Sequence, residues 1–132
     1  MDTLDTFRLF LHVLAASVWV GGQIVLAGLV PTVRSLDPEG PKKAARAFNR
    51  LAWPAYGVAV VTGLWNILAV DLNSIPHPEV EIKVLVVLLS GVGAVIHQMA
   101  RGNKAMLAIG GAMSSLFGAA ALWVGIAMSP VV

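Results

Sequence analysis

The stretch from Val80 to Arg101, VEIKVLVVLLSGVGAVIHQMAR, decides the fold class of this chain. It is rich in Val, Leu and Ile, and as one helix it is long enough to cross a bilayer core of about 30 Å. Its residues Lys83, Ser90 and His97 are spaced seven apart, which places them on nearly one helical face. Because a polar face is costly against lipid, we expect it to turn toward other helices or toward a bound group.

Composition places the whole chain in the same class. The 132 residues are 58% hydrophobic and 12% charged, about half the charged fraction of a soluble domain. Four apolar runs alternate with polar segments, so we predict an all-α, multi-pass integral membrane four-helix bundle in the cell membrane, with one domain over residues 1–132. The expected transmembrane helices are about 7–30, 42–70, 80–101 and 105–128. Pro31 is expected to end the first helix and Pro41 to open the second.

The basic residues are unevenly distributed along the chain. Seven of the nine fall in or beside the first and third connections, on one side of the expected membrane: Arg34, Lys42, Lys43, Arg46, Arg50, Arg101 and Lys104. The positive-inside rule therefore predicts that both termini lie on the outer side and that the basic connections lie in the cytoplasm. Topology thus explains the basic charge, and no nucleic-acid partner is expected.

The first apolar run carries a face of polar and small residues at helical spacing. That face comprises Arg8, His12, Ala15, Ala16, Trp19, Gly22 and Gln23. Small residues beside a histidine leave space that either a close helix or a ligand fills. The fourth run instead has Gly111, Gly118 and Gly125 at intervals of seven, and we expect this stripe to be a packing surface for a neighbouring helix.

Depth in the membrane separates the candidate site residues. His12, Asn66 and Lys83 lie about 5–8 Å from the outer ends of their helices, whereas His97 lies roughly 20 Å deeper than Lys83. His12 and His97 are both candidate metal ligands, but one small metal centre is not expected to be bound by both. Either there are two sites, or only one of these histidines is a ligand.

Three segments resemble a known family when they are taken in order. LHVLAASVWVGG (residues 11–22), ARAFNRLAWPAYGVAVVTGLWN (45–66) and IKVLVVLLSGVGAVIH (82–97) are similar to helices of the CopD-like copper-resistance family. They also resemble the HemJ-type protoporphyrinogen oxidases, four-helix membrane proteins that bind haem b. In that family a histidine of the first helix and a lysine opening the third are required. The resemblance assigns those roles to His12 and Lys83 and matches the later histidine to His97.

These observations lead to a first functional hypothesis and two alternatives. The first is haem b binding in the outer half of the bilayer, with cofactor-binding residues His12, Lys83, Arg8, Asn66 and Trp19. His12 would be an axial ligand, Lys83 a second ligand or a propionate partner, and Arg8 a propionate partner. The chain would then be a redox protein, either an electron-transfer protein or a haem-dependent oxidoreductase acting on a membrane substrate.

The second hypothesis is copper binding and transport, with an uptake site formed by His12, His77, Met128 and the outer acidic residues. The third is a scaffold without a cofactor, in which the polar strip only fixes the helix register. The expected partners are the lipid bilayer and a porphyrin or copper ligand, and a homodimer is an assembly that the sequence leaves open.

Overall fold

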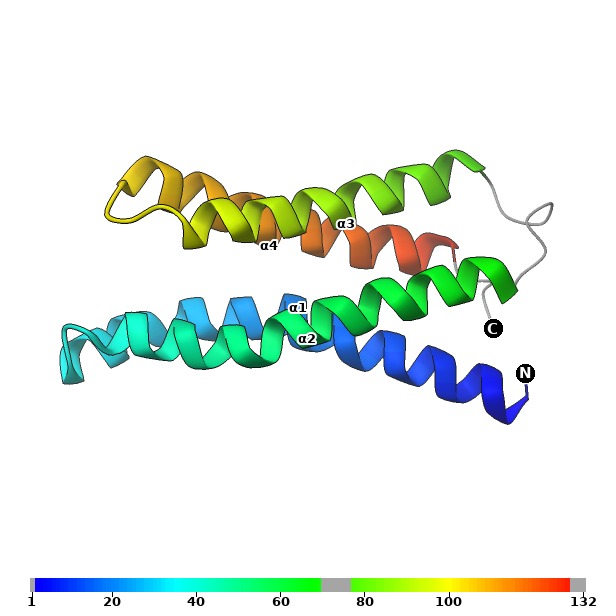
Figure 1. Cartoon of the computed structure of the whole chain (residues 1–132), viewed down its shortest axis with the longest axis horizontal. Helices are drawn as coiled ribbons and strands as arrows, with labels where there is room; N and C mark the ends of the chain where they lie inside the picture. Colours follow the sequence, from blue (N-terminus) through cyan, green and yellow to red (C-terminus); the bar gives the residue numbers. More distant parts are fainter. Residues whose placement is uncertain (1, 70–76, 129–132) are drawn as a thin grey trace. The chain divides into compact units, whose positions relative to one another are not determined.

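The computed structural model describes residues 2–69 and 77–128, and within these ranges it contains α-helices and no strand. The four helices are α1 (Thr3–Leu36), α2 (Gly40–Ala69), α3 (His77–Gln98) and α4 (Lys104–Met128) (Figure 1). Each is long and apolar enough to cross a membrane. The expected all-α class and the four membrane-spanning helices are therefore confirmed.

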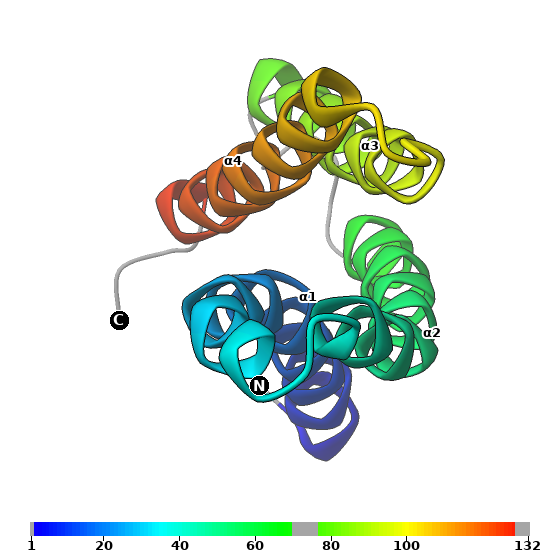
Figure 2. The same ribbon diagram turned by 90° about the vertical axis from the view of Figure 1, so that its left-hand side faces the viewer.

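The chain divides into two compact units, Met1–Ala69 and Val70–Val132. In the first unit α1 packs against α2, and in the second α3 packs against α4. Each unit is an antiparallel helical hairpin, and the end-on view shows the two helices of each hairpin side by side (Figure 2). The candidate residues are therefore described hairpin by hairpin.

Helix α1 begins at a capping box and continues beyond Pro31. The Asp2 carboxylate accepts a hydrogen bond from the Asp5 backbone N–H at 2.8 Å, which satisfies a donor of the first turn. The prediction that Pro31 ends the helix is wrong, because α1 runs on to Leu36. Proline removes only one helical hydrogen bond. The final turn of α1 is stabilised by the residue that follows the helix, because the Asp37 N–H donates to the Val33 carbonyl at 3.0 Å.

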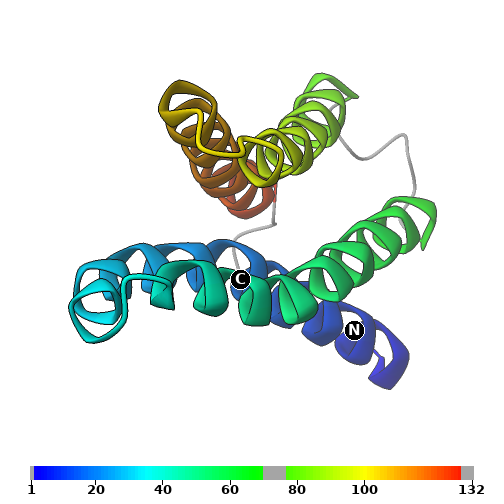
Figure 3. The ribbon, with the colours of Figure 1, turned by 60° about the vertical axis from the view of Figure 1, so that its left-hand side comes forward.

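The turn into α2 explains why both helices extend further than expected. A Cβ on Gly40 would lie 2.6 Å from Val33 Cγ1 and 2.8 Å from the Val33 carbonyl oxygen. Glycine therefore permits a close approach that closes the hairpin within a few residues, and α2 begins at Gly40 rather than at the expected residue 42. Figure 3 shows this short connection between the two helices.

Helix α3 is shifted toward the N-terminus relative to its expected bounds of 80–101. It begins at His77, which was expected in a loop, and it ends at Gln98. The chain then turns through Arg101 and Gly102, whose φ angles are 41° and 87°. This left-handed pair excludes helix at Arg101, so the basic turn replaces the last residues of the expected helix.

Helix α4 starts within one residue of its expected position. The Asn103 side-chain oxygen accepts hydrogen bonds from the backbone N–H groups of Ala105 and Met106, at 3.1 and 3.2 Å. Asn103 is thus the cap that fixes where α4 begins.

Candidate functional site

His12 projects from α1 onto the backbone of α2. Its Nδ1 lies 3.0 Å from the Ala59 carbonyl oxygen and 3.0 Å from the Thr62 hydroxyl. The Thr62 hydroxyl in turn donates to the Val58 carbonyl at 2.6 Å. Because a carbonyl oxygen only accepts hydrogen bonds, Nδ1 carries a proton and donates it to Ala59.

A glycine on α2 makes room for this imidazole. A Cβ on Gly63 would lie 3.2 Å from His12 Cε1 and 3.7 Å from Nδ1, so a larger residue would press on the ring. The ring orientation is therefore fixed by hydrogen bonding on one side and by contact with a glycine on the other.

Arg8 lies about one turn before His12 and is buried, with 7% of its surface exposed. Its Nε donates to Asn66 Oδ1 at 2.6 Å, and its Nη2 lies 2.8 Å from Asp5 Oδ1. The guanidinium carbon also lies 5.7 Å from the centroid of the Trp65 ring. The structure thus brings Arg8 and Asn66 together about one helical turn from His12.

Trp19 lies in an aromatic cluster of the same hairpin. It is 5% exposed, and its ring centroid is 5.2 Å from that of Trp53 and 4.6 Å from that of Tyr56. The space expected beside Gly22 is also filled, because a Cβ there would overlap the Phe48 ring. This end of the α1 face therefore packs against α2, about 10 Å along the helix from His12.

The polar strip of α3 turns toward α4, which confirms that it faces another helix. Ser90 is 1% exposed and donates to the Ser114 carbonyl at 2.7 Å. His97 Nδ1 lies 2.8 Å from the Leu107 carbonyl oxygen and therefore donates to it, although the residue remains exposed. At the other end of the strip, a Cβ on Gly125 would lie 2.9 Å from Lys83 Nζ.

The glycines of α4 divide into two sets. Gly111 and Gly125 of the expected stripe receive the side chains of His97 and Lys83. The closest backbone contact instead involves Gly110, where a Cβ would overlap the His97 backbone nitrogen and would lie 2.7 Å from both the Gly93 carbonyl oxygen and His97 Cα. At Gly111 and Gly125 the stripe therefore accommodates polar side chains, and the close backbone contact at Gly110 lies one residue away from it.

The candidate residues consequently fall into separate groups. His12, Arg8 and Asn66 meet between α1 and α2, whereas Lys83 and His97 lie about 20 Å apart along α3. Among the described residues, no three His, Cys, Asp or Glu side chains come close enough together to hold a metal ion. His77 begins α3, and its side chain lies outside the described part of the structure.

Sequence reasoning missed two features of the α1–α2 site. Asp5 pairs with Arg8, and its spacing of three residues on the first helical turn is the signal that could have revealed this pair. Tyr56 packs on Trp19, a contact between helices for which no local sequence signal exists. No family model, no curated protein and no solved structure matches the chain.

Proposed function

We propose that this chain is a membrane protein that binds haem b through the α1–α2 hairpin, with His12 as an axial ligand. The observation that carries the proposal is the hydrogen bond from His12 Nδ1 to the Ala59 carbonyl, at 3.0 Å. Histidines that bind metals commonly donate their second ring N–H to a carbonyl or carboxylate, which fixes the tautomer and orients the ring. The Nε2 lone pair is then the ligating electron pair.

Arg8 supports the proposal as a partner for a haem propionate. A guanidinium has five N–H donors, and the contacts with Asn66 and Asp5 use Nε and Nη2. Its remaining donors suit an added carboxylate, and its burial strengthens such a charge-assisted bond. Asn66 would hold the guanidinium in place while Asp5 competes with the propionate for it.

Lys83 stays a proposal from the sequence, as a propionate partner in preference to an iron ligand. Lys83 is partly buried, and its Nζ reaches the backbone of α4 at Gly125. Haem would supply one-electron redox chemistry, and the protein residues would bind and orient it. We also propose that the chain belongs to the CopD-like and HemJ-type families, because of the three segments quoted above. We further propose that both termini lie on the outer side of the cell membrane.

The test is an absorption spectrum of the detergent-purified protein from cells supplied with haem precursor. The parent should show a Soret band, His12→Ala should lose it, and His97→Ala should keep it. His97→Ala is a matched control, because His97 also bonds a backbone carbonyl through Nδ1, at 2.8 Å. A Soret band retained in His12→Ala and lost in His97→Ala would place the ligand on α3.

Substitutions of Lys83 distinguish a charged partner from an iron ligand. Arginine keeps the positive charge but does not bind iron at ordinary pH. A propionate partner therefore predicts an unchanged spectrum for Lys83→Arg and weakened haem binding for Lys83→Ala. The same altered spectrum in both variants would identify Lys83 as a ligand.

Copper is the alternative cargo, because the same His12 geometry presents an imidazole nitrogen suited to a copper ion. Equilibrium dialysis against copper, with the parent and the two histidine variants, separates the two functions. Binding of copper that depends on His12, in protein without a Soret band, would replace the haem proposal.

A further inference from the structure

One face of α2 carries basic residues at one end and apolar residues along the rest. Arg46, Arg50, Pro54, Gly57, Val61 and Trp65 are spaced four, four, three, four and four apart, so they form a single stripe along the helix. All six residues are exposed. Most of the stripe is distinct from the face that bears Asn66 and Ala59, which contact α1, and only its last residue, Trp65, also lies against Arg8 of α1.

The arginines of this stripe differ from the lysines at the start of α2. Lys43 Nζ lies 2.8 Å from Asp37 Oδ2, and Lys42 Nζ lies 3.7 Å from Glu39 Oε2. Within residues 2–69 and 77–128, Arg46 has no acidic partner, and neither does Arg50. The stripe therefore presents two cations whose charge the described protein does not neutralise.

Their position along the helix matches a lipid headgroup layer. Residues 51–69 of α2 carry no charged side chain and span about 28 Å, close to the 30 Å of a hydrocarbon core. Arg50 lies at the edge of this segment, and Arg46 lies about 6 Å beyond it. A headgroup layer is about 5–7 Å thick, so both guanidinium groups can reach lipid phosphates.

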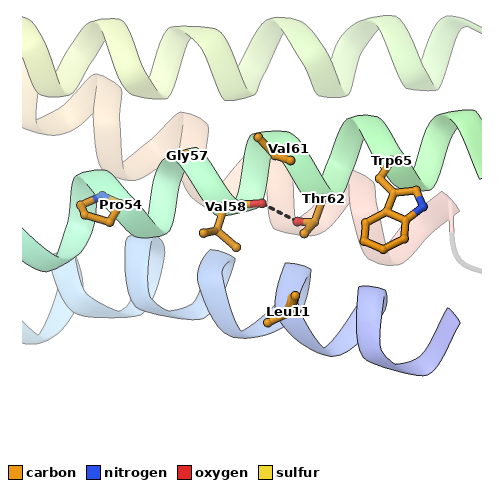
Figure 4. Close-up of a pocket in the computed structure, with 7 residues that line it drawn as sticks. All are labelled: Leu11, Pro54, Gly57, Val58, Val61, Thr62 and Trp65. Carbon is orange, nitrogen blue, oxygen red and sulfur yellow. Dashed lines mark hydrogen bonds between the residues drawn. The ribbon is translucent and has the colours of Figure 1, made fainter. Parts of the chain in front are cut away.

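The apolar part of the stripe borders a hollow of about 470 Å³ (Figure 4). Its lining consists of Leu11, Pro54, Gly57, Val58, Val61, Thr62 and Trp65. The Thr62 hydroxyl is turned to the Val58 carbonyl, so the lining offers hydrocarbon almost throughout. A Cβ on Gly57 would meet nothing within 4 Å, which makes Gly57 an open notch in the middle of the hollow.

The length of the hollow matches one acyl chain. Pro54 and Trp65 are eleven residues apart, or about 16 Å along the axis, and half of a hydrocarbon core is about 15 Å. We propose that this face of the α1–α2 hairpin binds one anionic phospholipid. Its phosphate pairs with Arg46 and Arg50, and one of its acyl chains lies in the hollow. The lipid proposal does not require haem, although Thr62 and Trp65 of the lining also contact His12 and Arg8.

Lipid selectivity measured by electron spin resonance tests this site. The full chain is reconstituted into phosphatidylcholine vesicles that contain a trace of spin-labelled phosphatidylglycerol or spin-labelled phosphatidylcholine. The motionally restricted fraction gives the association constant of each lipid relative to the host lipid. The parent should prefer phosphatidylglycerol, and each arginine should contribute about five-fold to that preference.

Two pairs of substitutions with equal charge change make the result specific. Arg46→Gln with Arg50→Gln should abolish the preference, whereas Lys42→Gln with Lys43→Gln should largely keep it, since those lysines already have acidic partners. Equal loss in both double variants would show that only net charge matters and would overturn the site. An unchanged preference in the arginine variant would also overturn it.

Filling the hollow tests the acyl-chain part of the proposal. Gly57→Leu should reduce the restricted fraction of both labelled lipids, because the new side chain occupies the notch. If Gly57→Leu instead converts a dimer to a monomer in sedimentation and leaves the lipid fractions unchanged, the hollow holds a second copy of the chain. That outcome would refute the lipid proposal.

Discussion

Replacing Gly110 by alanine should destabilise the α3–α4 hairpin, because the added methyl group would meet backbone. Its Cβ would lie 2.7 Å from the Gly93 carbonyl oxygen and 2.7 Å from His97 Cα. Ordinary contacts of this kind lie at 3.4–4 Å, so the helices would have to separate by most of an ångström. Neither contact atom is the end of a flexible side chain that could move aside.

The size of the effect follows from two opposing contributions. Inserting a methyl group into a packed contact typically costs about 1–3 kcal/mol, and a helix separation of this size also weakens neighbouring contacts. Alanine gains up to about 1 kcal/mol over glycine in helix propensity. Gly28→Ala is the matched control for that gain, since a Cβ there would meet nothing within 4 Å.

The assay is reversible unfolding of the purified protein in mixed micelles with increasing sodium dodecyl sulfate. We expect the free energy of unfolding of Gly110→Ala to lie about 1–3 kcal/mol below that of Gly28→Ala. If the two variants unfold alike, the helices do not cross at Gly110 and the reasoning is refuted.

The remaining predictions concern a buried cation, a surface carboxylate and the topology. Asn66→Ala should lower the free energy of unfolding in the same assay by about 1–3 kcal/mol, because it leaves a buried Nε donor of Arg8 without its acceptor; stability equal to the parent would contradict this. The hydrogen bond from Lys43, followed by that from the Glu39 backbone, lowers the pKa of Asp37 in the folded protein. Its stabilising contribution is therefore present above the unfolded pKa of about 3.9 and is lost as pH falls through the lower folded value. An NMR titration of Lys43→Gln should show a raised Asp37 pKa, and an unchanged value would exclude the pairing. A cysteine at the exposed Ser35 should react with a membrane-impermeant reagent only after cells are opened; labelling in intact cells would invert the topology.

The sequence determined the helices because their signals are local. Apolar length and proline-rich or charged connections specified four membrane-spanning segments, and the spacing of Ser90 and His97 correctly indicated an inward-facing strip. Residues seven apart lie on nearly one face of any α-helix, so this prediction did not require the position of the neighbouring helix.

Helix ends were determined less well, because they depend on contacts across a turn. Pro31 lies inside α1, and the helix ends only where Val33 accepts a hydrogen bond from Asp37 and packs beside Gly40. The single-residue propensity of proline contains none of this information.

Only the tertiary structure decided which groups the candidate residues meet. The helices cross at Gly110 and not at Gly111 because of how α4 is rotated about its axis. The sequence does not distinguish the two positions, since both are glycines. The tautomer of His12 depends on the Ala59 carbonyl, which lies 47 positions along the chain. The hydrogen-bond partner of Arg8 is the side-chain amide of Asn66, 58 positions away. Such contacts arise from the packing of one helix against another. Every residue has a backbone carbonyl, so the sequence does not indicate which carbonyl will accept a given hydrogen bond.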